Sequence, residues 1–229
     1  MAELGDLQGK KIIHLQCNTG ADTILLARMG ASAVGVDLVP ENISYAKKLA
    51  ADVGVTNASF IESDIMDFMD KHNEKYDVVF VSEGAVGWLP DMAKWGQTIR
   101  HLLKDDGFVY IFEGHPFMLM FDESKLNDGV TEIKYPYFKK DPDVDNSIGG
   151  YASEVKEGVE TFFWMYKVSD VLNSLISAGL HVEFFHEFQE NFYDLGGGKR
   201  VDGNLYNFDY NKGLFPMSFS LKASVYKRH

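Results

Sequence analysis

The chain has 229 residues, of which 45% are hydrophobic, so it is large enough to build one globular domain around a substantial core. Its formal net charge of −12 disfavours nucleic acid as a partner, because binding a phosphate backbone requires a basic stripe. The single cysteine excludes a disulfide framework, and no segment reads as a membrane helix or a signal peptide, so we expect a cytoplasmic protein without a membrane partner.

The first half of the chain alternates between strand-like and helix-like segments. Short apolar runs predict five strands, at residues 10–16, 32–38, 58–64, 76–82 and 107–115. Helical character predicts helices at residues 22–30, 40–54 and 91–104, and the segment 65–75 is expected to form a short helix and a loop. The helix at 91–104 would carry one apolar stripe, formed by Met92, Trp95, Ile99, Leu102 and Leu103. Alternation of this kind implies right-handed crossovers, and therefore a parallel sheet with helices on both faces.

Two helices carry specific predictions about their ends and faces. In the segment 40–54, Pro40 suits the first helical position, because that position needs no N–H donor. One face of this helix would hold Ile43, Ala46, Leu49 and Val53. A later helix is expected at 167–180, with Ser169 as its N-cap and Gly179 as its C-terminal stop.

The alternating pattern breaks after the fifth strand. Residues 116–162 show no sustained period and are too long for a plain connector, so we expect either a functional lid or a partly disordered segment. Further strands are expected at 181–188 and 215–226, with a glycine-rich loop at 196–198 between them. The chain is therefore expected to form a single domain, residues 1–229, with the inserted lid as its substrate-binding segment.

The loop after the first strand lies where doubly wound sheets bind ligands, at the carboxyl end of a strand. A dinucleotide would require glycines in this loop, because its pyrophosphate must approach the backbone closely. Gln16 and Asn18 stand where such a fingerprint would carry glycine, and only Gly20 remains. Asparagine tolerates left-handed backbone angles, so the turn can still form, but a nucleoside without a pyrophosphate fits the loop better.

Acidic residues end the next two strands. At the end of the second strand, the Asp37 carboxylate could accept hydrogen bonds from both hydroxyls of a ribose, or it could cap the following helix. At the end of the third strand, Asp64 could accept a hydrogen bond from an adenine amino group with Ile65 against the ring, or serve as a turn or helix-cap residue. We favour the nucleoside interpretation for both aspartates.

Four segments of the chain form a series. They are IIHLQCNTGADTILLARMGASAVGVDLVPENISYAKKLA, FIESDIMDF, YDVVFVSEGAVGWLPDM and LLKDDGFVYIFEGHP. In this order and spacing they resemble the motifs of class I S-adenosylmethionine-dependent methyltransferases, especially a bacterial small-molecule-type subgroup with HLQC in the first motif. The segment FPMSFSLKA is similar to the antiparallel seventh strand of that fold. The resemblance implies an α/β fold with a doubly wound, Rossmann-like seven-stranded sheet, mostly parallel with an antiparallel last strand, and S-adenosylmethionine as cofactor.

The resemblance also implies which residues would contact the cofactor. The loop after the first strand would line its methionine and ribose part, the next two strand ends would meet ribose and adenine, and the loop after the fourth strand would lie near the sulfonium. In this order the residues are Gln16, Cys17, Asn18 and Gly20; Asp37 and Leu38; Asp64 and Ile65; and Ser82, Glu83 and Gly84.

Some features depart from the family pattern. His14 replaces the usual acidic residue at the start of the first motif, and Gln16 and Asn18 replace two of the usual glycines. These changes motivate an alternative hypothesis, a non-catalytic regulatory protein that binds S-adenosylmethionine or S-adenosylhomocysteine on the same fold. The chain also begins almost directly on the first strand, whereas relatives usually have N-terminal helices over the cofactor, so we expect a truncated chain or a different cover.

Methyl transfer is an in-line displacement on a positively charged sulfonium, and much of its acceleration can come from positioning. A base is needed only if the nucleophile arrives protonated. His115 follows the fifth strand and Glu83 the fourth, so both are candidate catalytic residues. Alternatively, His115 could stabilise the turn before Pro116, and Glu83 could be a solvated turn residue. Glu113 is a third candidate with the same alternatives, whereas Cys17 is better explained as a buried core residue.

Aromatic side chains could form either a substrate cavity or the core of the inserted lobe. They are Trp88, Tyr135, Tyr137, Phe138, Tyr151, Phe162, Phe163 and Trp164. Near the end of the chain, His181 and His186 are of metal-ligand type, but they face opposite sides of a strand and lack zinc-like spacing, so no metal is predicted.

The lead hypothesis is an enzyme that transfers a methyl group from S-adenosylmethionine to a small-molecule acceptor. The non-catalytic binding protein remains the alternative. A nicotinamide-dependent oxidoreductase is disfavoured, because the first loop lacks the glycines that a dinucleotide requires.

Overall fold

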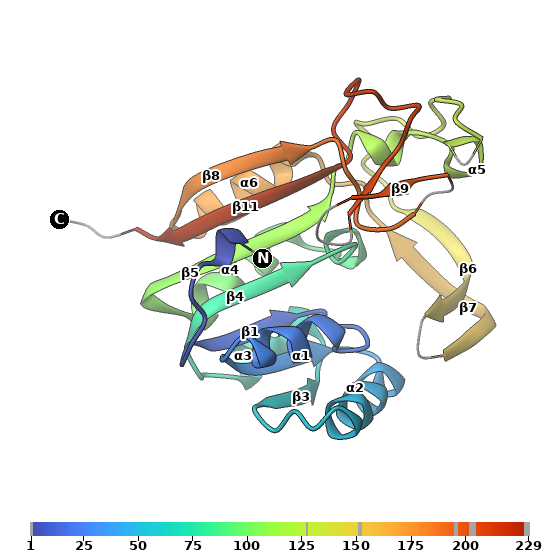
Figure 1. The fold of residues 1–229 in the computed structure, drawn as a ribbon. Coiled ribbons are helices and arrows are strands. Elements are labelled where there is room, and N and C mark those ends of the chain that lie inside the picture. Colours follow the sequence, from blue (N-terminus) through green and yellow to red (C-terminus); the bar gives the residue numbers. More distant parts are fainter. Residues whose placement is uncertain (1, 127, 151–152, 195–196, 202–204, 227–229) are drawn as a thin grey trace.

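Seven strands form the central sheet of the computed structural model, which describes residues 2–126, 128–150, 153–194, 197–201 and 205–226. In chain order they are β1 (Lys11–Leu15), β2 (Ser32–Asp37), β3 (Ala58–Glu62), β4 (Tyr76–Ser82), β5 (Leu103–Gly114), β8 (Leu180–Phe188) and β11 (Ser218–Val225). Their order across the sheet is β3-β2-β1-β4-β5-β11-β8 (Figure 1). The first five strands are parallel, and β11 runs antiparallel to both of its neighbours. The expected sheet with an antiparallel last strand is confirmed.

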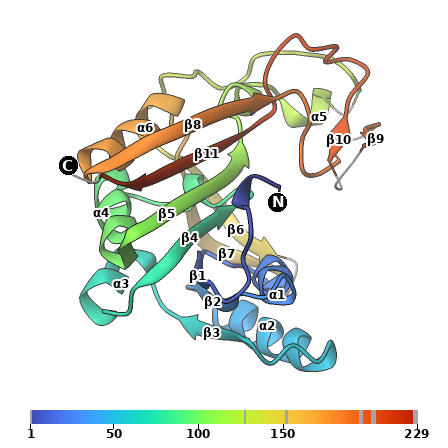
Figure 2. The same cartoon turned by 60° about the vertical axis from the view of Figure 1, so that its left-hand side comes forward.

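Helices cover both faces of the sheet (Figure 2). One face carries α1 (Ala21–Arg28) and α2 (Pro40–Asp52), and the other carries α3 (Ile65–Lys71), α4 (Met92–Leu102) and α6 (Val168–Ser177). The larger core lies on the second face, where α4 buries Trp95, Ile99 and Leu102 completely. These residues recur at the three- and four-residue spacing of one helical face, as the sequence predicts. Within the described ranges, no helix combines the length and the apolar character needed to cross a bilayer.

Two details of the helix predictions are wrong. Val53 lies beyond the end of α2 and is 39% exposed, so it leaves the helical period, and Ala50 takes its place on the buried face. In α6, the N-cap is Lys167 rather than Ser169. The helix begins earlier because the Asp170 carboxylate reaches back, accepting from the backbone N–H of Lys167 at 3.1 Å and from its Nζ at 2.6 Å. The C-terminal stop at Gly179, with φ +85°, is confirmed.

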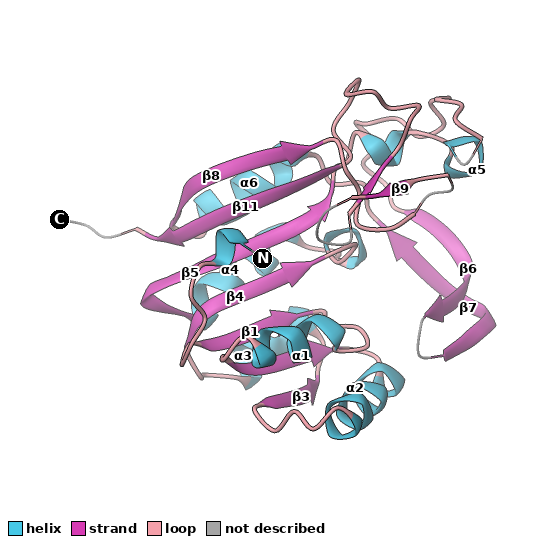
Figure 3. Ribbon diagram, in the orientation of Figure 1, coloured by secondary structure: helices cyan, strands magenta, loops and turns pink. Residues whose placement is uncertain are grey.

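The segment 116–162 contains an antiparallel hairpin that the sequence did not reveal. Its strands are β6 (Asp143–Gly150) and β7 (Ser153–Phe163), and they project from the edge at which the parallel strands end (Figure 3). We call this edge the carboxyl edge. The pairing register shifts twice along the hairpin, which interrupts the alternation that would otherwise mark two strands. Tyr151 lies outside the described residues.

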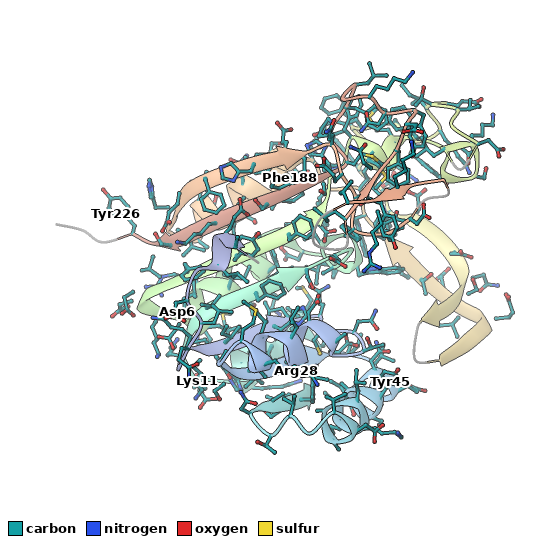
Figure 4. The ribbon with its side chains drawn as sticks, in the orientation of Figure 1. Asp6, Lys11, Arg28, Tyr45, Phe188 and Tyr226 are labelled. Carbon is teal, nitrogen blue, oxygen red and sulfur yellow. The ribbon has the colours of Figure 1, made fainter. Side chains whose placement is uncertain are left out.

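A small lobe sits beside the hairpin at the carboxyl edge. It is built from η3 (Met118–Met120), α5 (Glu123–Leu126), β9 (Lys199–Arg200), β10 (Tyr206–Asn207) and the loops that join them. Its buried side chains are Met118, Phe121, Leu126, Phe208, Phe215 and Met217. Figure 4 shows Phe188 where β8 ends and the chain enters this lobe, and Tyr226 at the opposite edge. Gly196 of the expected glycine-rich loop lies outside the described residues.

Candidate functional site

The strand order reverses between β1 and β4, so the loops that follow these two strands meet at the carboxyl edge. Gln16 connects the two loops, because its Nε2 donates a hydrogen bond to the carbonyl oxygen of Ala85 at 2.7 Å. The Oε1 atom of the same side chain is buried and has no hydrogen-bond partner among the described residues. This is the position at which a doubly wound sheet binds its ligand.

The loop after β1 has left-handed backbone angles at the places where a dinucleotide fingerprint would carry glycine. The φ angles are +54° at Gln16, +48° at Asn18 and +75° at Gly20. A non-glycine residue in this region costs roughly 1–2 kcal/mol, so the loop is strained. Gly20 cannot be replaced, because a Cβ there would lie 2.6 Å from the Ala46 Cβ and from the Phe60 ring. The expectation that the turn forms despite the two substitutions is confirmed.

Asp37 is nearly buried at the end of β2 and ties this loop to the start of α2. Its Oδ2 accepts from the backbone N–H of Asn18 at 2.8 Å. Its Oδ1 accepts from the backbone N–H of Val39 at 3.0 Å and from Nδ2 of Asn42 at 3.1 Å. A carboxylate offers about four acceptor sites, so the three bonds leave some capacity for a ligand. The neighbouring Leu38 is 62% exposed and offers an apolar surface beside it.

Asp64 serves as the N-cap of α3, where its Oδ1 accepts from the backbone N–H of Met66 at 2.8 Å. The Ile65 side chain is only 3% exposed and packs in the larger core. The helix-cap role considered for Asp64 is therefore present in the structure. Contact of Asp64 and Ile65 with an adenine ring stays a prediction.

A buried hydrogen-bonded chain lies beneath the two loops. His14 Nδ1 is 2.9 Å from Thr23 Oγ1, and its Nε2 is 3.1 Å from Ser82 Oγ. Ser82 in turn donates to Asp22 Oδ2 at 2.9 Å, so Ser82 accepts from an Nε2–H and Nδ1 accepts from Thr23. Burial lowers the pKa of His14 to about 4, against the opposing charges of nearby aspartates. The residue that replaces the usual acidic side chain is thus a neutral, fully bonded histidine.

The low pKa of His14 leads to a prediction about stability. The unfolded chain takes up this proton near 6.5, whereas the folded chain takes it up only near about 4. Above about pH 6.5 the ring is neutral in both states, and the folded state keeps its full stability. As the pH falls from there toward about 4, the free energy of unfolding decreases by up to about 1.4 kcal/mol per pH unit. We expect the free energy of unfolding, measured in urea, to fall more steeply from pH 6.5 to 5 than in His14→Gln.

The exposed His181 provides the control for this comparison. His181→Gln should keep the steep slope of the parent protein. Glu83 has a raised pKa and changes stability in the opposite direction over this range, but it is common to all three proteins and cancels in the comparison. Equal slopes for the parent protein and His14→Gln would contradict the neutral assignment.

Glu113 holds the loop after β4 in place. It is 7% exposed, and its carboxylate accepts four backbone N–H groups. Oε1 accepts from Gly84 at 2.5 Å and Gly114 at 2.7 Å, and Oε2 accepts from Ala85 at 2.8 Å and Val86 at 3.1 Å. Burial raises the pKa of Glu113, against the effect of these four donors. Its side chain is therefore neither a solvated turn residue nor free to orient a substrate.

The sequence carried one signal of this role. Glu113 is in step with Val109 and Ile111 along β5, so strand alternation turns it toward the buried face. A buried carboxylate needs partners, but its loop donors Gly84, Ala85 and Val86 precede it by 27 to 29 residues. Periodicity alone could not identify donors so far away in the chain.

Glu83 is the first residue after β4 and has a φ of +42°. Its carboxylate has no hydrogen-bond or ion-pair partner among the described residues. The side chain keeps access to solvent, yet the surrounding protein removes part of its hydration. This desolvation, together with the charges of Asp22 and Glu113, raises the pKa of Glu83 to about 7. A carboxylate that titrates near neutral pH suits proton transfer.

His115 is 5% exposed and has protein neighbours at both ring nitrogens. Its Nδ1 accepts from the backbone N–H of Phe117 at 3.1 Å, and its Nε2 lies 3.1 Å from Glu187 Oε1. Burial lowers the pKa of His115, against the opposing effect of Glu187. This geometry supports the turn-stabilising role. A catalytic role for His115 stays a prediction that would require Nε2 to leave Glu187.

The β6–β7 hairpin packs on the same loop that carries Glu83. The backbone N–H of Trp164 donates to the carbonyl oxygen of Gly87 at 2.7 Å. A Cβ on Gly87 would lie 2.3 Å from the Phe163 ring, so the glycine permits close packing. Trp88 meets Phe163 edge to face at 5.3 Å, and Phe162 lies 6.0 Å from Trp164. Half of the aromatic set singled out from the sequence therefore gathers next to the site, whereas Tyr137 and Phe138 form a separate pair.

Cys17 and the histidines of β8 have structural surroundings. Burial and the charge of Asp37 raise the pKa of the Cys17 thiol to about 12, so it is not a nucleophile at neutral pH. His186 pairs with Glu3 at 2.7 Å, and His181 packs against Tyr226. Among the side chains that the structure describes, no three of metal-ligating type come together.

Comparisons with known proteins agree with this geometry. Residues 6–137 match the family model described as a methyltransferase domain. The ubiquinone biosynthesis O-methyltransferase of Actinobacillus pleuropneumoniae serotype 7 is 32% identical over 108 residues, which make up 45% of each chain. An uncharacterized RNA methyltransferase of Caldanaerobacter subterraneus is 36% identical over 86 residues, which make up 38% of this chain and 19% of that protein.

A solved structure, that of a candidate S-adenosylmethionine-dependent methyltransferase from Listeria monocytogenes, has a TM-score of 0.67 and 18% identity. The match covers 99% of this chain and 94% of that one, and it shows a shared fold. The matched segments span less than half the length of the two curated relatives. Because the family model covers more than half of the present sequence, this chain belongs to the methyltransferase domain family.

Proposed function

We propose that this protein transfers a methyl group from S-adenosylmethionine to a small-molecule acceptor. The observation that carries the proposal is the arrangement at the switch point, where a strained, glycine-poor loop, the Asp37 carboxylate and the Glu83 loop meet in a methyltransferase-family domain. The solved Listeria neighbour is described as dependent on S-adenosylmethionine, and one curated relative methylates in ubiquinone biosynthesis. The net charge of −12 favours a small molecule over the RNA substrate of the other named relative.

The residues at the carboxyl edge fit this cofactor. Asp37 has about one acceptor site free and would gain a second if the Asn42 side chain gave up its bond, so that both ribose hydroxyls could bind. Leu38 offers an apolar surface to the adenosine. The buried Oε1 of Gln16 lacks a donor, which the cofactor's ammonium group would supply. Nothing in this set requires a pyrophosphate. When bound, the cofactor supplies an electrophilic methyl group on a positively charged sulfonium.

The protein contributes position and surroundings to the reaction. Glu113 fixes the backbone of residues 84–86, so the loop next to the reacting groups is held before the substrates bind. Such orientation can contribute roughly 7–11 kcal/mol to lowering the barrier. Glu83 holds or accepts a proton at its carboxylate. The segment 116–162, with the hairpin on the Glu83 loop, serves as the substrate-binding lid of a single domain that works in the cytoplasm.

The departures from the family motif do not favour the non-catalytic alternative. The loop at Gln16 and Asn18 forms with the left-handed angles that glycine would supply. His14 is satisfied on both ring nitrogens and adds no charge. All three substitutions are therefore accommodated by the local backbone and hydrogen bonds.

Calorimetric titration tests the proposal directly. We expect S-adenosylmethionine and S-adenosylhomocysteine to bind with micromolar affinity and NAD not to bind, because the first loop suits a nucleoside without a pyrophosphate. Methyl transfer is then followed with radiolabelled cofactor and sets of amines, phenols, thiols and carboxylic acids. NAD binding without cofactor binding would overturn the assignment, and cofactor binding without any turnover would support the regulatory alternative.

A further inference from the structure

Three of the five loops that follow the parallel strands at the carboxyl edge contain an acidic residue. Five fully described segments follow the parallel strands, and none of them contains a lysine or an arginine; they are residues 16–20, 38–39, 63–64, 83–91 and 115–122. The same edge carries seven carboxylates, those of Asp22, Asp37, Asp64, Glu83, Asp91, Glu113 and Asp122. A ligand that binds at these five loops therefore meets carboxylates and no lysine or arginine of the loops themselves, which favours a cation over an anion.

Most of these carboxylates already have structural tasks. Asp37 and Glu113 accept three and four hydrogen bonds. Asp64 and Asp91 each cap a helix, and Asp122 bonds to Ser124. Asp22 and Glu83 remain. Asp22 accepts a hydrogen bond from the Ser82 hydroxyl. Only Glu83 has no partner among the described residues.

The surroundings of Glu83 suit an organic cation. Trp88 lies on the same loop, packs edge to face with Phe163 and remains 52% exposed. Aromatic rings attract ammonium groups through their negative faces, so the tryptophan and the carboxylate act in the same sense. The unpartnered carboxylate and the exposed ring on the same loop both favour a group that donates hydrogen bonds and carries positive charge.

We propose that the methyl acceptor is an amine that arrives as an ammonium ion and gives its proton to Glu83. The inference rests on the proposed methyl transfer and names its substrate class. A carboxylate or phosphate acceptor would face unpartnered negative charge with no lysine or arginine in these five loops. An ammonium ion instead pairs with the free carboxylate, on the loop that also carries the exposed tryptophan.

The proton and electron balance is complete without another reactant. One proton passes from the ammonium group to the Glu83 carboxylate, which leaves a neutral amine with a free electron pair. That pair forms the bond to the methyl carbon while the carbon–sulfur bond breaks, and the electron pair of the broken bond stays on sulfur. The products are an N-methylammonium ion and a neutral thioether. Glu83 then returns its proton to water through its solvent-exposed side, and its pKa of about 7 suits both steps.

Two matched probes test the role of Glu83. An alkylamine is charged at neutral pH and needs a base, whereas an aromatic amine is already neutral and does not. We expect Glu83→Gln to lower kcat for the alkylamine roughly 100-fold and to change kcat for the aromatic amine little. The alkylamine rate in this variant should recover as the pH rises toward the substrate's own pKa. Asp106→Asn, which removes an exposed charge at the opposite edge, should leave both rates unchanged.

A binding measurement provides a readout independent of turnover. In the presence of saturating S-adenosylhomocysteine, alkylammonium affinity should fall roughly tenfold in Glu83→Gln, which corresponds to the loss of one ion pair. Preferred methylation of phenols, thiols or carboxylic acids, or equal losses for both amines, would overturn the amine assignment while leaving methyl transfer intact. Failure of the cofactor itself to bind would overturn the proposed function instead, so the two failures can be told apart.

Discussion

Replacing Glu113 with alanine is expected to destabilise the protein by roughly 4 kcal/mol or more. The change removes the only acceptor described for four backbone N–H groups at 2.5 to 3.1 Å. Each buried donor left without a partner costs roughly 1–3 kcal/mol. A domain of ordinary stability has only about 5–15 kcal/mol in total, so much of the variant would unfold near its working temperature. Urea unfolding measures the effect.

Two further variants separate this effect from the loss of a negative charge. Glu113→Gln keeps one oxygen acceptor and should lose about half as much stability. Glu183→Ala removes a carboxylate from the exposed pair with Lys222 and should cost less than about 1 kcal/mol. If Glu113→Ala were no less stable than Glu183→Ala, the four hydrogen bonds would not hold the loop as described.

Replacing Asp37 with alanine is expected to lower the affinity for S-adenosylhomocysteine by at least roughly 100-fold. In the proposed complex, the carboxylate accepts a charge-assisted hydrogen bond from each ribose hydroxyl. Such bonds contribute roughly 1.5–3 kcal/mol each, and 1.4 kcal/mol corresponds to a factor of ten. Calorimetric titration measures the affinity, and circular dichroism should show an intact fold.

The structure supplies a control for the indirect effects of this change. Asp37 also accepts from Asn42, so Asn42→Ala loosens the surroundings of the carboxylate without removing it. Affinity in Asn42→Ala should stay within a few-fold of the parent value. Unchanged affinity in Asp37→Ala, or equal losses in both variants, would count against ribose binding by this residue.

Local patterns were sufficient to predict the framework of the fold. The apolar runs that became β1 to β5 and the stripe of Trp95, Ile99 and Leu102 in α4 are short-range signals, and each appears in the structure. The left-handed turn at Asn18 followed from the residue type alone. The position of Asp37 at a strand end followed from the same reasoning.

Features that depend on distant contacts could not be predicted in this way. The hairpin was not predicted, because its register shifts disrupt the alternation of side chains along β6 and β7. The role of Glu113 depends on donors in another loop, and the pKa of Glu83 depends on Asp22, a neighbour in space from another part of the chain. The hydrogen bonds to both ring nitrogens of His14, and the contacts of His115 with Phe117 and Glu187, are likewise set by tertiary structure.

A crystal structure of the protein with S-adenosylhomocysteine tests the central claim most directly. We expect both ribose hydroxyls within hydrogen-bond distance of Asp37, the adenine beside Asp64, and the sulfur facing the loop that carries Glu83. An adenosine bound away from both aspartates, or a site at the switch point that stays empty at saturating ligand, would contradict the claim.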